Sequence, residues 1–358
     1  MKKRLFIANT FSQFIIACQI SLTLFKDDII DMVLTDQTEG LSSVYANLKG
    51  TKRVFNSIYL YRTKDYCDKH VFFGYANDIV KCVFTKGLYT YFANSYYDEL
   101  IYFNLDYALL SMVDNLSKKN RNIIVSRYEE GVLSYNHEFD YSRLNIIRKL
   151  RKICGRTDPD DYQGFFYCFF PQLYRGKLEP VKIPPVTRND NKLYSTIKKC
   201  FDIKIDENCY ARKYIFFSSV YDFEGETSIG EYDAVCKIAD LVGKDNILIK
   251  MHPRDRRTIY TDNGFMVDSN SAFPWEAIQF NVDIQNKILL TVNSSSVLST
   301  TLMFGNMVRS YYVYKLCDVS HNSYAKESIS TIENVLFNDD LKKNLSSVKI
   351  LEQIDELI

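Results

Sequence analysis

The hydrophobic positions of the first half of the chain fall into short continuous runs, separated by stretches with helical spacing. The runs predict buried strands, and the stretches between them predict helices that connect parallel strands. The expected strands are Leu5–Ala8, Ile29–Leu34, Ser57–Leu60, Glu99–Phe103 and Asn122–Arg127. The expected helices are Phe11–Leu24, Leu41–Leu48 and Tyr107–Leu116. This alternation favours a parallel sheet with crossover helices.

A second alternating pattern begins after a proline-rich segment. Leu173–Val186 contains three prolines and little helical periodicity, which predicts a linker. Beyond it, strands are expected at Tyr214–Phe217, Ile247–Lys250 and Ile288–Val292. Helices are expected at Tyr232–Leu241, Trp275–Phe280 and Ser296–Phe304, with one or two amphipathic helices over Asp339–Ile358. We therefore expect two α/β domains, residues 1–178 and residues 187–358.

Two Rossmann-like α/β domains facing a central cleft constitute the GT-B architecture of glycosyltransferases, which this pattern favours. The 358 residues suffice for two such cores. Ligands of open parallel sheets bind beyond the carboxyl ends of the strands, so the residues after each strand are the first candidates for chemistry. No unbroken stretch of about 20 apolar residues occurs, so no transmembrane helix is expected.

Charge and composition exclude several classes of protein. The 45 Lys and Arg nearly balance the 44 Asp and Glu, so no global positive potential favours nucleic acid as a partner. The nine Cys and four His lack ligand spacing, and the acidic run at 158–161 reads as a polar turn, so no metal site is expected. An odd number of cysteines without a C-x-x-C pair indicates reduced thiols in the cytoplasm.

His252 and Pro253 come just after the predicted strand Ile247–Lys250. The proline holds the histidine in extended backbone, which would aim the imidazole into a cleft. The imidazole could donate a hydrogen bond or a proton to a phosphate there, and basic residues nearby would supply positive charge. The basic residues are Lys250, Arg254, Arg256 and Arg257. A strand-end histidine in a polar loop with solvated arginines is the structural alternative.

Glu129, Glu130 and Gly131 follow the last predicted strand of the first domain. One carboxylate could serve as a general base while the other tunes its pKa, and the glycine would allow a tight turn. An ordinary acidic turn is the structural alternative.

Two further motifs lie in the second domain. Ser294, Ser295 and Ser296 precede an apolar helix, where hydroxyls and N–H groups could bind a phosphate or simply cap the helix. Pro274 starts another predicted helix, with Glu276 in its first turn. A carboxylate there could hold a ribose diol or complement the helix dipole.

The order and spacing of these motifs resemble those of bacterial sialyltransferases, most closely glycosyltransferase family 52 and its relatives, which include the bacterial polysialyltransferases. Those families share a D/E-D/E-G motif, a His-Pro motif, a Pro-x-Glu element and a paired Ser/Thr motif. The matches are Glu129-Glu130-Gly131, His252-Pro253, Pro274-Trp275-Glu276 and Ser295-Ser296. Met251 replaces the proline that often precedes the histidine, and the serine triplet leaves its register ambiguous by one.

The resemblance implies inverting, metal-independent transfer of sialic acid from CMP-sialic acid to a galactoside-type hydroxyl in capsule or lipooligosaccharide biosynthesis. Glu129 or Glu130 would deprotonate the acceptor, and His252 would assist departure of CMP. The remaining site residues implied for substrate binding are Gly131, Pro253, Arg254, Pro274, Glu276, Ser294, Ser295 and Ser296. A carboxylate at 222–231 could be the base instead, and its candidates are Asp222, Glu224, Glu226 and Glu231.

Several alternatives stay open. The donor could be another CMP-activated acid, such as Kdo or a different nonulosonate, and the chain could be a non-catalytic glycan-assembly protein with the same fold. No cofactor is expected besides the donor substrate. The expected location is cytoplasmic, with association to the inner face of the cell membrane and a homodimer both left open.

Overall fold

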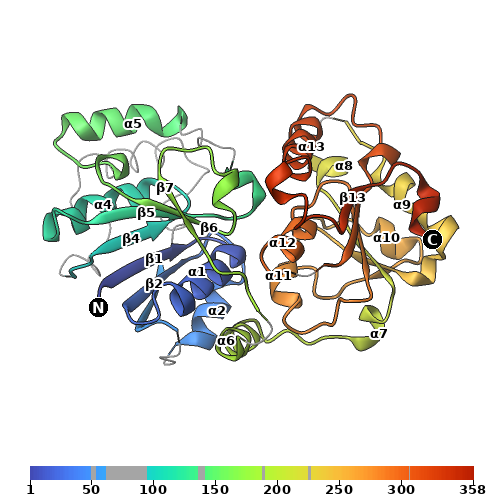
Figure 1. The fold of residues 1–358 in the computed structure, drawn as a ribbon, viewed down its shortest axis with the longest axis horizontal. Helices are drawn as coiled ribbons and strands as arrows, with labels where there is room; N and C mark the ends of the chain where they lie inside the picture. Colours follow the sequence, from blue (N-terminus) through green and yellow to red (C-terminus); the bar gives the residue numbers. More distant parts are fainter. Residues whose placement is uncertain (50–53, 62–94, 136–141, 188–189, 225–226, 306) are drawn as a thin grey trace. The chain divides into compact units, whose positions relative to one another are not determined.

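The computed structural model describes residues 1–49, 54–61, 95–135, 142–187, 190–224, 227–305 and 307–358. They form two compact α/β units, each with a parallel sheet and helices (Figure 1). Unit 1 comprises residues 1–130, 134–184 and 191–201. Unit 2 comprises residues 131–133, 185–190 and 202–358.

The sheet of unit 1 has the order β3-β2-β1-β4-β5-β6-β7, with every described pair parallel. Its strands are β1 (Lys3–Ala8), β2 (Ile29–Thr35), β3 (Ser57–Tyr61), β4 (Glu99–Tyr102), β5 (Ile124–Tyr128), β6 (Phe165–Cys168) and β7 (Glu179–Lys182). The helices are α1 (Phe11–Thr23), α2 (Leu41–Leu48), α4 (Tyr107–Lys119), α5 (Ser142–Ile153) and α6 (Asn191–Phe201). The strand order reverses direction at β1 and β4, so their carboxyl ends form the switch point where ligands of such sheets bind.

Successive side chains of β1 pack on opposite faces of the sheet, as the pleat of a strand requires. Leu5 and Ile7 belong to a buried cluster that includes side chains of α4. Phe6 points to the opposite face, where its ring packs against Phe25 and Tyr128. Burial of each such side chain contributes about 1.5–3 kcal/mol, which holds helices to both faces of the sheet.

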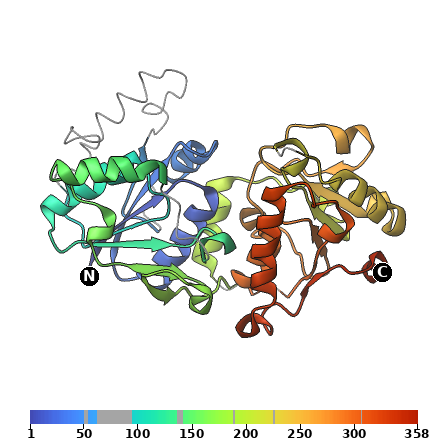
Figure 2. The ribbon, with the colours of Figure 1, turned by 90° about the horizontal axis from the view of Figure 1, so that it is seen from above.

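The sheet of unit 2 has the order β10-β9-β8-β11-β12-β13, also parallel throughout its described pairs. Its strands are β8 (Tyr214–Phe217), β9 (Ile247–Lys250), β10 (Met266–Val267), β11 (Ile288–Thr291), β12 (Arg309–Tyr312) and β13 (Val348–Ile350). The helices are α7 (Glu207–Tyr210), α8 (Tyr221–Glu224), α9 (Glu231–Val242), α10 (Ile259–Asp262), α11 (Trp275–Ile278), α12 (Ser296–Leu302) and α13 (Ser323–Leu336). Figure 2 shows α13, in red, standing beside these strands. The order reverses between β8 and β11, which places the switch point of unit 2 at their carboxyl ends.

The structure differs from the expected linker over Leu173–Val186. This segment contains β7, which pairs with β6 from Phe165 opposite Glu179 to Cys168 opposite Lys182. Strand β7 lies at the edge of the sheet and pairs with a neighbour on one side only. Pro180, which has no backbone N–H, therefore disrupts fewer hydrogen bonds there than it would in a central strand. The prolines therefore mark an edge strand rather than the absence of structure.

The expected amphipathic helices over Asp339–Ile358 are also wrong. Val348–Ile350 instead forms β13 against β12, flanked by short 3₁₀ turns. A strand of three residues is too short to show an alternation of apolar and polar positions, which explains why helices were predicted there. Helix α6 was not expected, and although it follows the proline-rich segment it belongs to unit 1, where it packs on α1 and α2.

No helix among the described residues has both the length and the apolar character that crossing a membrane requires.

Candidate active site

Three of the four predicted motifs directly follow a strand at its carboxyl end. Glu129 and Glu130 follow β5 in unit 1. His252 comes after β9 and Ser294 comes after β11, both in unit 2. Because β9, β8 and β11 are neighbours in one parallel sheet, the His-Pro and serine motifs share one edge of that sheet, at its switch point.

Glu129 is buried, and its side chain is held by two donors. The Tyr135 hydroxyl donates a short hydrogen bond to Oε2, and the Phe169 N–H donates another of 2.7 Å to the same oxygen. Within the part of the chain that the structure describes, both bonds go to Oε2, which leaves Oε1 to receive a proton. Burial raises the pKa of Glu129 to about 7, near the value that suits a general base at neutral pH.

Glu130 lies on the other side of the turn and is partly exposed. Its Oε1 accepts a hydrogen bond of 2.6 Å from the hydroxyl of Thr10, which follows β1. Gln13 of α1 also hydrogen-bonds Glu130, and burial raises the pKa of this carboxyl. Gln13 further donates to Asn104, which follows β4, at 2.9 Å. Glu130 thus joins a polar cluster at the switch point of unit 1.

Gly131 adopts a backbone conformation that explains the third position of this motif. Its φ of 127° lies in a region that residues with a Cβ rarely adopt. A Cβ built there would meet no atom within 4 Å, so the requirement comes from the backbone and not from crowding.

His252 is fixed through its backbone and through one ring nitrogen. Its N–H donates to the Ser218 hydroxyl at 2.8 Å, and its Nδ1 accepts from the Arg254 N–H at 3.2 Å. Burial, and next the positive charge of Arg254, lowers the pKa of His252 to about 4. The imidazole is therefore neutral at pH 7, and because Nδ1 accepts, Nε2 carries the proton that a ligand can receive.

The basic residues around His252 differ in their roles. Lys250 is buried, and its Nζ donates to the backbone oxygens of Phe273 at 2.9 Å and Ser271 at 3.3 Å. Arg257 pairs with Asp255 at 2.7 Å. Arg254 and Arg256 are exposed beside Pro253, itself exposed. Lys250 thus ties the His-Pro strand to the loop before Pro274, instead of offering charge to a ligand as expected from the sequence.

The Pro-x-Glu and serine motifs are joined by two side-chain hydrogen bonds. Trp275 donates from Nε1 to the Thr300 hydroxyl at 2.8 Å. Glu276 accepts from the Ser299 hydroxyl at 2.6 Å. Pro274 is the N-cap residue of α11, and its extended backbone places Glu276 in the first turn of the helix. Residues expected to contact ribose and phosphate are therefore held on one pair of helices.

The three serines separate into structural and exposed positions. The Ser294 hydroxyl accepts a hydrogen bond of 3.3 Å from the Ser296 N–H, which is a local capping role. Ser295 is exposed and Ser296 is half-buried. The Ser294 hydroxyl keeps its own proton to donate, so which of the three serines contacts a ligand stays a prediction.

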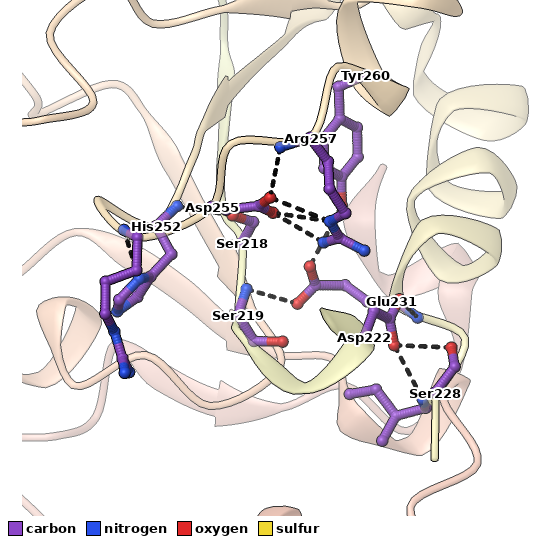
Figure 3. Close-up of polar contacts among 11 residues, drawn as sticks. Ser218, Ser219, Asp222, Ser228, Glu231, His252, Asp255, Arg257 and Tyr260 are labelled. Carbon is purple, nitrogen blue, oxygen red and sulfur yellow. Dashed lines mark hydrogen bonds and ion pairs between the residues drawn. The ribbon is translucent and has the colours of Figure 1, made fainter. Parts of the chain in front are cut away.

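The alternative acidic stretch is mainly structural where it is described. Asp222 accepts hydrogen bonds from the backbone N–H groups of Ile229 at 2.8 Å and Glu231 at 3.1 Å (Figure 3). Glu231 has no exposed surface, and burial raises the pKa of its carboxyl to about 7. Glu226 lies outside the described residues.

Sequence reasoning missed the partners that orient these motifs. Ser218 after β8 accepts the His252 N–H, Tyr135 holds Glu129, and Thr10 holds Glu130. A pair of serines directly after the apolar run Tyr214–Phe217 was the one available signal. In the described parts of the chain, no three or more His, Cys, Asp or Glu side chains are grouped so as to hold a metal ion.

Two α/β units, each with a parallel sheet, form the fold of the GT-B class, as expected from the sequence. The chain belongs to the alpha-2,8-polysialyltransferase family, whose model matches residues 78–313, and the resemblance to bacterial sialyltransferases is thereby confirmed.

The similarity to solved structures concerns the fold alone. The spinosyn rhamnosyltransferase SpnG complexed with thymidine diphosphate has a TM-score of 0.50 and 12% identity, covering 97% of this chain and 96% of that chain. The S. aureus MnaA structure with UDP has a TM-score of 0.49 and 11% identity, covering 98% of this chain and 92% of that chain. No curated protein matches the chain in sequence.

Proposed function

We propose that this protein transfers sialic acid from CMP-sialic acid to a terminal sugar hydroxyl, of the galactoside type, on a cell-surface glycan. The observation that carries the proposal is the joining of three motifs in unit 2. Lys250, two residues before His252, bonds the loop that precedes Pro274, and Glu276 bonds α12, which starts at the serines. A histidine, a carboxylate and hydroxyls held together suit a nucleoside monophosphate, and the match to a sialyltransferase family favours CMP.

In the proposed reaction, the ribose and the phosphate of CMP each have a partner. Glu276 accepts hydrogen bonds from the ribose hydroxyls, and the hydroxyls of Ser295 and Ser296 donate to the phosphate. His252 donates from Nε2 to the phosphate oxygen that leaves. Because the imidazole is neutral, it acts as a hydrogen-bond donor: its Nε2–H stabilises the negative charge that grows on the phosphate, and the proton stays on the ring.

The acceptor hydroxyl attacks the anomeric carbon of sialic acid directly. The new bond forms from the hydroxyl oxygen to this carbon, while the bond from the carbon to the phosphate oxygen breaks and its electron pair leaves with CMP. The hydroxyl proton passes to Glu129, which Tyr135 and the Phe169 N–H hold by Oε2. A single displacement inverts the anomeric configuration, and since the leaving group is a monophosphate, we propose that no metal ion takes part.

The test is a purified-enzyme assay with CMP-sialic acid and lactose, read by mass detection of sialyllactose and by release of CMP. Parallel reactions contain EDTA, or CMP-Kdo in place of CMP-sialic acid. We expect product with CMP-sialic acid, unchanged by EDTA. If CMP-Kdo gave product and CMP-sialic acid did not, the donor would be another CMP-activated acid. Activity that disappears in EDTA and returns with Mg²⁺ or Mn²⁺ would reject the metal-independent mechanism, and turnover of UDP-sugars alone would reject the donor.

We place the reaction in the cytoplasm, where CMP-activated sugars would be the donor pool for capsule or lipooligosaccharide synthesis. The family match supports the donor class, while the acceptor and its linkage are to be read from the mass and the fragmentation of the product. Cell fractionation, with the protein in the supernatant or on the inner membrane, tests the location.

A further inference from the structure

The carboxyl of Glu231 lies buried beneath the turn that follows β8. Glu231 is the first residue of α9 and has no exposed surface. One of its oxygens accepts a hydrogen bond of 2.8 Å from the Ser219 N–H (Figure 3). The other accepts one of 3.3 Å from the hydroxyl of Tyr260 on α10. A group enclosed in this way cannot meet a substrate hydroxyl without leaving its position.

The start of α9 does not depend on this carboxyl. Gly230, the N-cap residue, offers no side-chain cap, and Asp222 accepts from the N–H groups of Ile229 and Glu231, the second of which is the first N–H of the helix. Asp222 also accepts from the Ser228 hydroxyl at 2.9 Å. The Glu231 side chain is directed away from this helix start, to the turn at Ser219 and to Tyr260.

The turn that Glu231 holds is the one that holds His252. Ser218 immediately precedes Ser219, and its hydroxyl accepts the His252 N–H at 2.8 Å. The Ser218 N–H in turn donates to the Lys250 backbone oxygen at 3.0 Å. These bonds continue the β8–β9 ladder past the strand ends, so the turn and the His252 backbone form one hydrogen-bonded piece.

We propose that Glu231 is a positioning residue for His252, acting through Ser219 and Ser218. The proposal rests on the proposed function in one respect, since His252 is the residue assigned to the leaving phosphate. Glu231 therefore contributes to turnover without contacting substrate. Both protonation states of its carboxyl can accept the Ser219 N–H, so the role requires an oxygen acceptor at this position and not a negative charge.

Two substitutions of Glu231 separate this role from that of a base. Glu231→Gln keeps a carbonyl oxygen for the Ser219 N–H and an amide that can pair with Tyr260, so turnover should stay within about threefold of the wild type. Glu231→Leu leaves the Ser219 N–H without its acceptor, and kcat should fall on the order of 10- to 100-fold, as misplacement of a reacting group does. If Glu231→Gln abolished turnover, the carboxyl would be a catalytic base and the proposal would be wrong.

A double-variant comparison tests whether Glu231 acts through His252. In a His252→Ala background, Glu231→Leu should lower the residual turnover by much less than it does in the wild type, because the side chain it positions is absent. An undiminished fold-change in that background would mean that the two residues act independently, which would overturn the proposal.

Ser218→Ala provides a second route should Glu231→Leu fail to fold. This variant removes the acceptor of the His252 N–H while it leaves Glu231 and Ser219 in place. It should reproduce the fall in kcat with little change in the donor KM. Full turnover in a folded Ser218→Ala protein would overturn the proposal.

A measurement without turnover distinguishes failure of this proposal from failure of the proposed function. The imidazole of His252 can be titrated by NMR, with its pKa expected at about 4 in the wild type. The groups that set this value besides burial are Arg254, Lys250 and Asp255. The value should be kept in Glu231→Gln and should rise in Glu231→Leu and Ser218→Ala as the ring gains solvent. An unchanged titration in the last two variants would reject the positioning role, even if the enzyme proved to use another donor.

Discussion

Glu276 on α11 accepts a hydrogen bond of 2.6 Å from the hydroxyl of Ser299 on α12. The bond joins two motifs that the sequence presents as separate, and it fixes one carboxylate oxygen of Glu276 while the other can meet a ligand. Ser299 lies one helical turn beyond Ser295 and Ser296, so ribose and phosphate contacts would share one small framework.

The first prediction concerns the ribose contact. Glu276→Ala should weaken CMP binding by about 10- to 150-fold, because a hydrogen bond to a charged group is worth about 1.5–3 kcal/mol. Ser299→Ala should weaken it less, since the carboxylate stays and loses only its orientation. Calorimetric titration with CMP measures both. Equal affinity in wild type and Glu276→Ala would remove Glu276 from the nucleotide site.

The second prediction separates phosphate from nucleoside recognition. The double variant Ser295→Ala/Ser296→Ala should lose more affinity for CMP than for cytidine, because only CMP carries the phosphate. The wild type should gain more thermal stability from CMP than from UMP or UDP at equal concentration, by ligand linkage. Thermal denaturation with each ligand checks this. A larger shift with UDP than with CMP would reject the sialyltransferase donor.

The third prediction assigns the base between neighbouring carboxylates. Glu129→Gln should lower kcat on the order of 10²–10⁴-fold with CMP affinity nearly unchanged, whereas Glu130→Gln should have a smaller effect. Glu231→Gln serves as the matched control for the alternative acidic stretch. Steady-state kinetics of the three variants decides the matter, and loss of turnover in Glu130→Gln alone would shift the role to the partly exposed carboxyl.

The fourth prediction concerns pH and stability at Glu129. Its folded-state pKa of about 7 lies above the ordinary value, so its contribution to stability is present at acid pH and is lost as pH rises through 7. Glu129→Gln should therefore melt at a higher temperature than the wild type at pH 8, with a smaller difference at pH 5. An identical pH dependence of Tm in both proteins would contradict the raised pKa.

The fifth prediction concerns His252 in the free enzyme. Because its pKa lies near 4, the imidazole is neutral across pH 5.5–9, and the acid limb of kcat/KM should follow the ionisation of Glu129 near pH 7. His252→Ala should lower the whole profile by about 10²–10⁴-fold without moving the midpoint of that limb. A midpoint that shifts in His252→Ala would identify the histidine as the group that titrates.

Much of the fold could be predicted from the sequence, because its central strands are apolar runs bounded by polar residues. The expected strands Tyr214–Phe217 and Ile247–Lys250 are confirmed as β8 and β9 with the same bounds. Five strands were missed, namely β6, β7, β10, β12 and β13. Of these, β10 and β13 have only two and three residues, which is too short for a run of apolar residues to stand out, and β7 carries Pro180.

The placement of the motifs at strand ends could also be predicted, but the direction of individual side chains could not. Lys250 looks like one of several cations beside His252, yet its ammonium group reaches the carbonyls of the loop before Pro274. The sequence does not distinguish the roles of Glu129 and Glu130. In the fold, Glu129 is buried against Tyr135, whereas Glu130 bonds Thr10. These outcomes depend on partners far away in the chain, which local patterns do not encode.

The path of the chain around residue 190 constrains how relatives of this enzyme could be recombined. Residues 185–190 belong to unit 2, where the Val186 N–H bonds the Met303 backbone oxygen at 2.8 Å, whereas α6 belongs to unit 1. A chimera with one crossover before residue 191 would seat the fully buried Leu193 and Ile197 of α6 on a foreign α2. A crossover just after Phe201 leaves only the short segments 131–133 and 185–190 of unit 2 with the other parent, so hybrid enzymes should fold best when joined there.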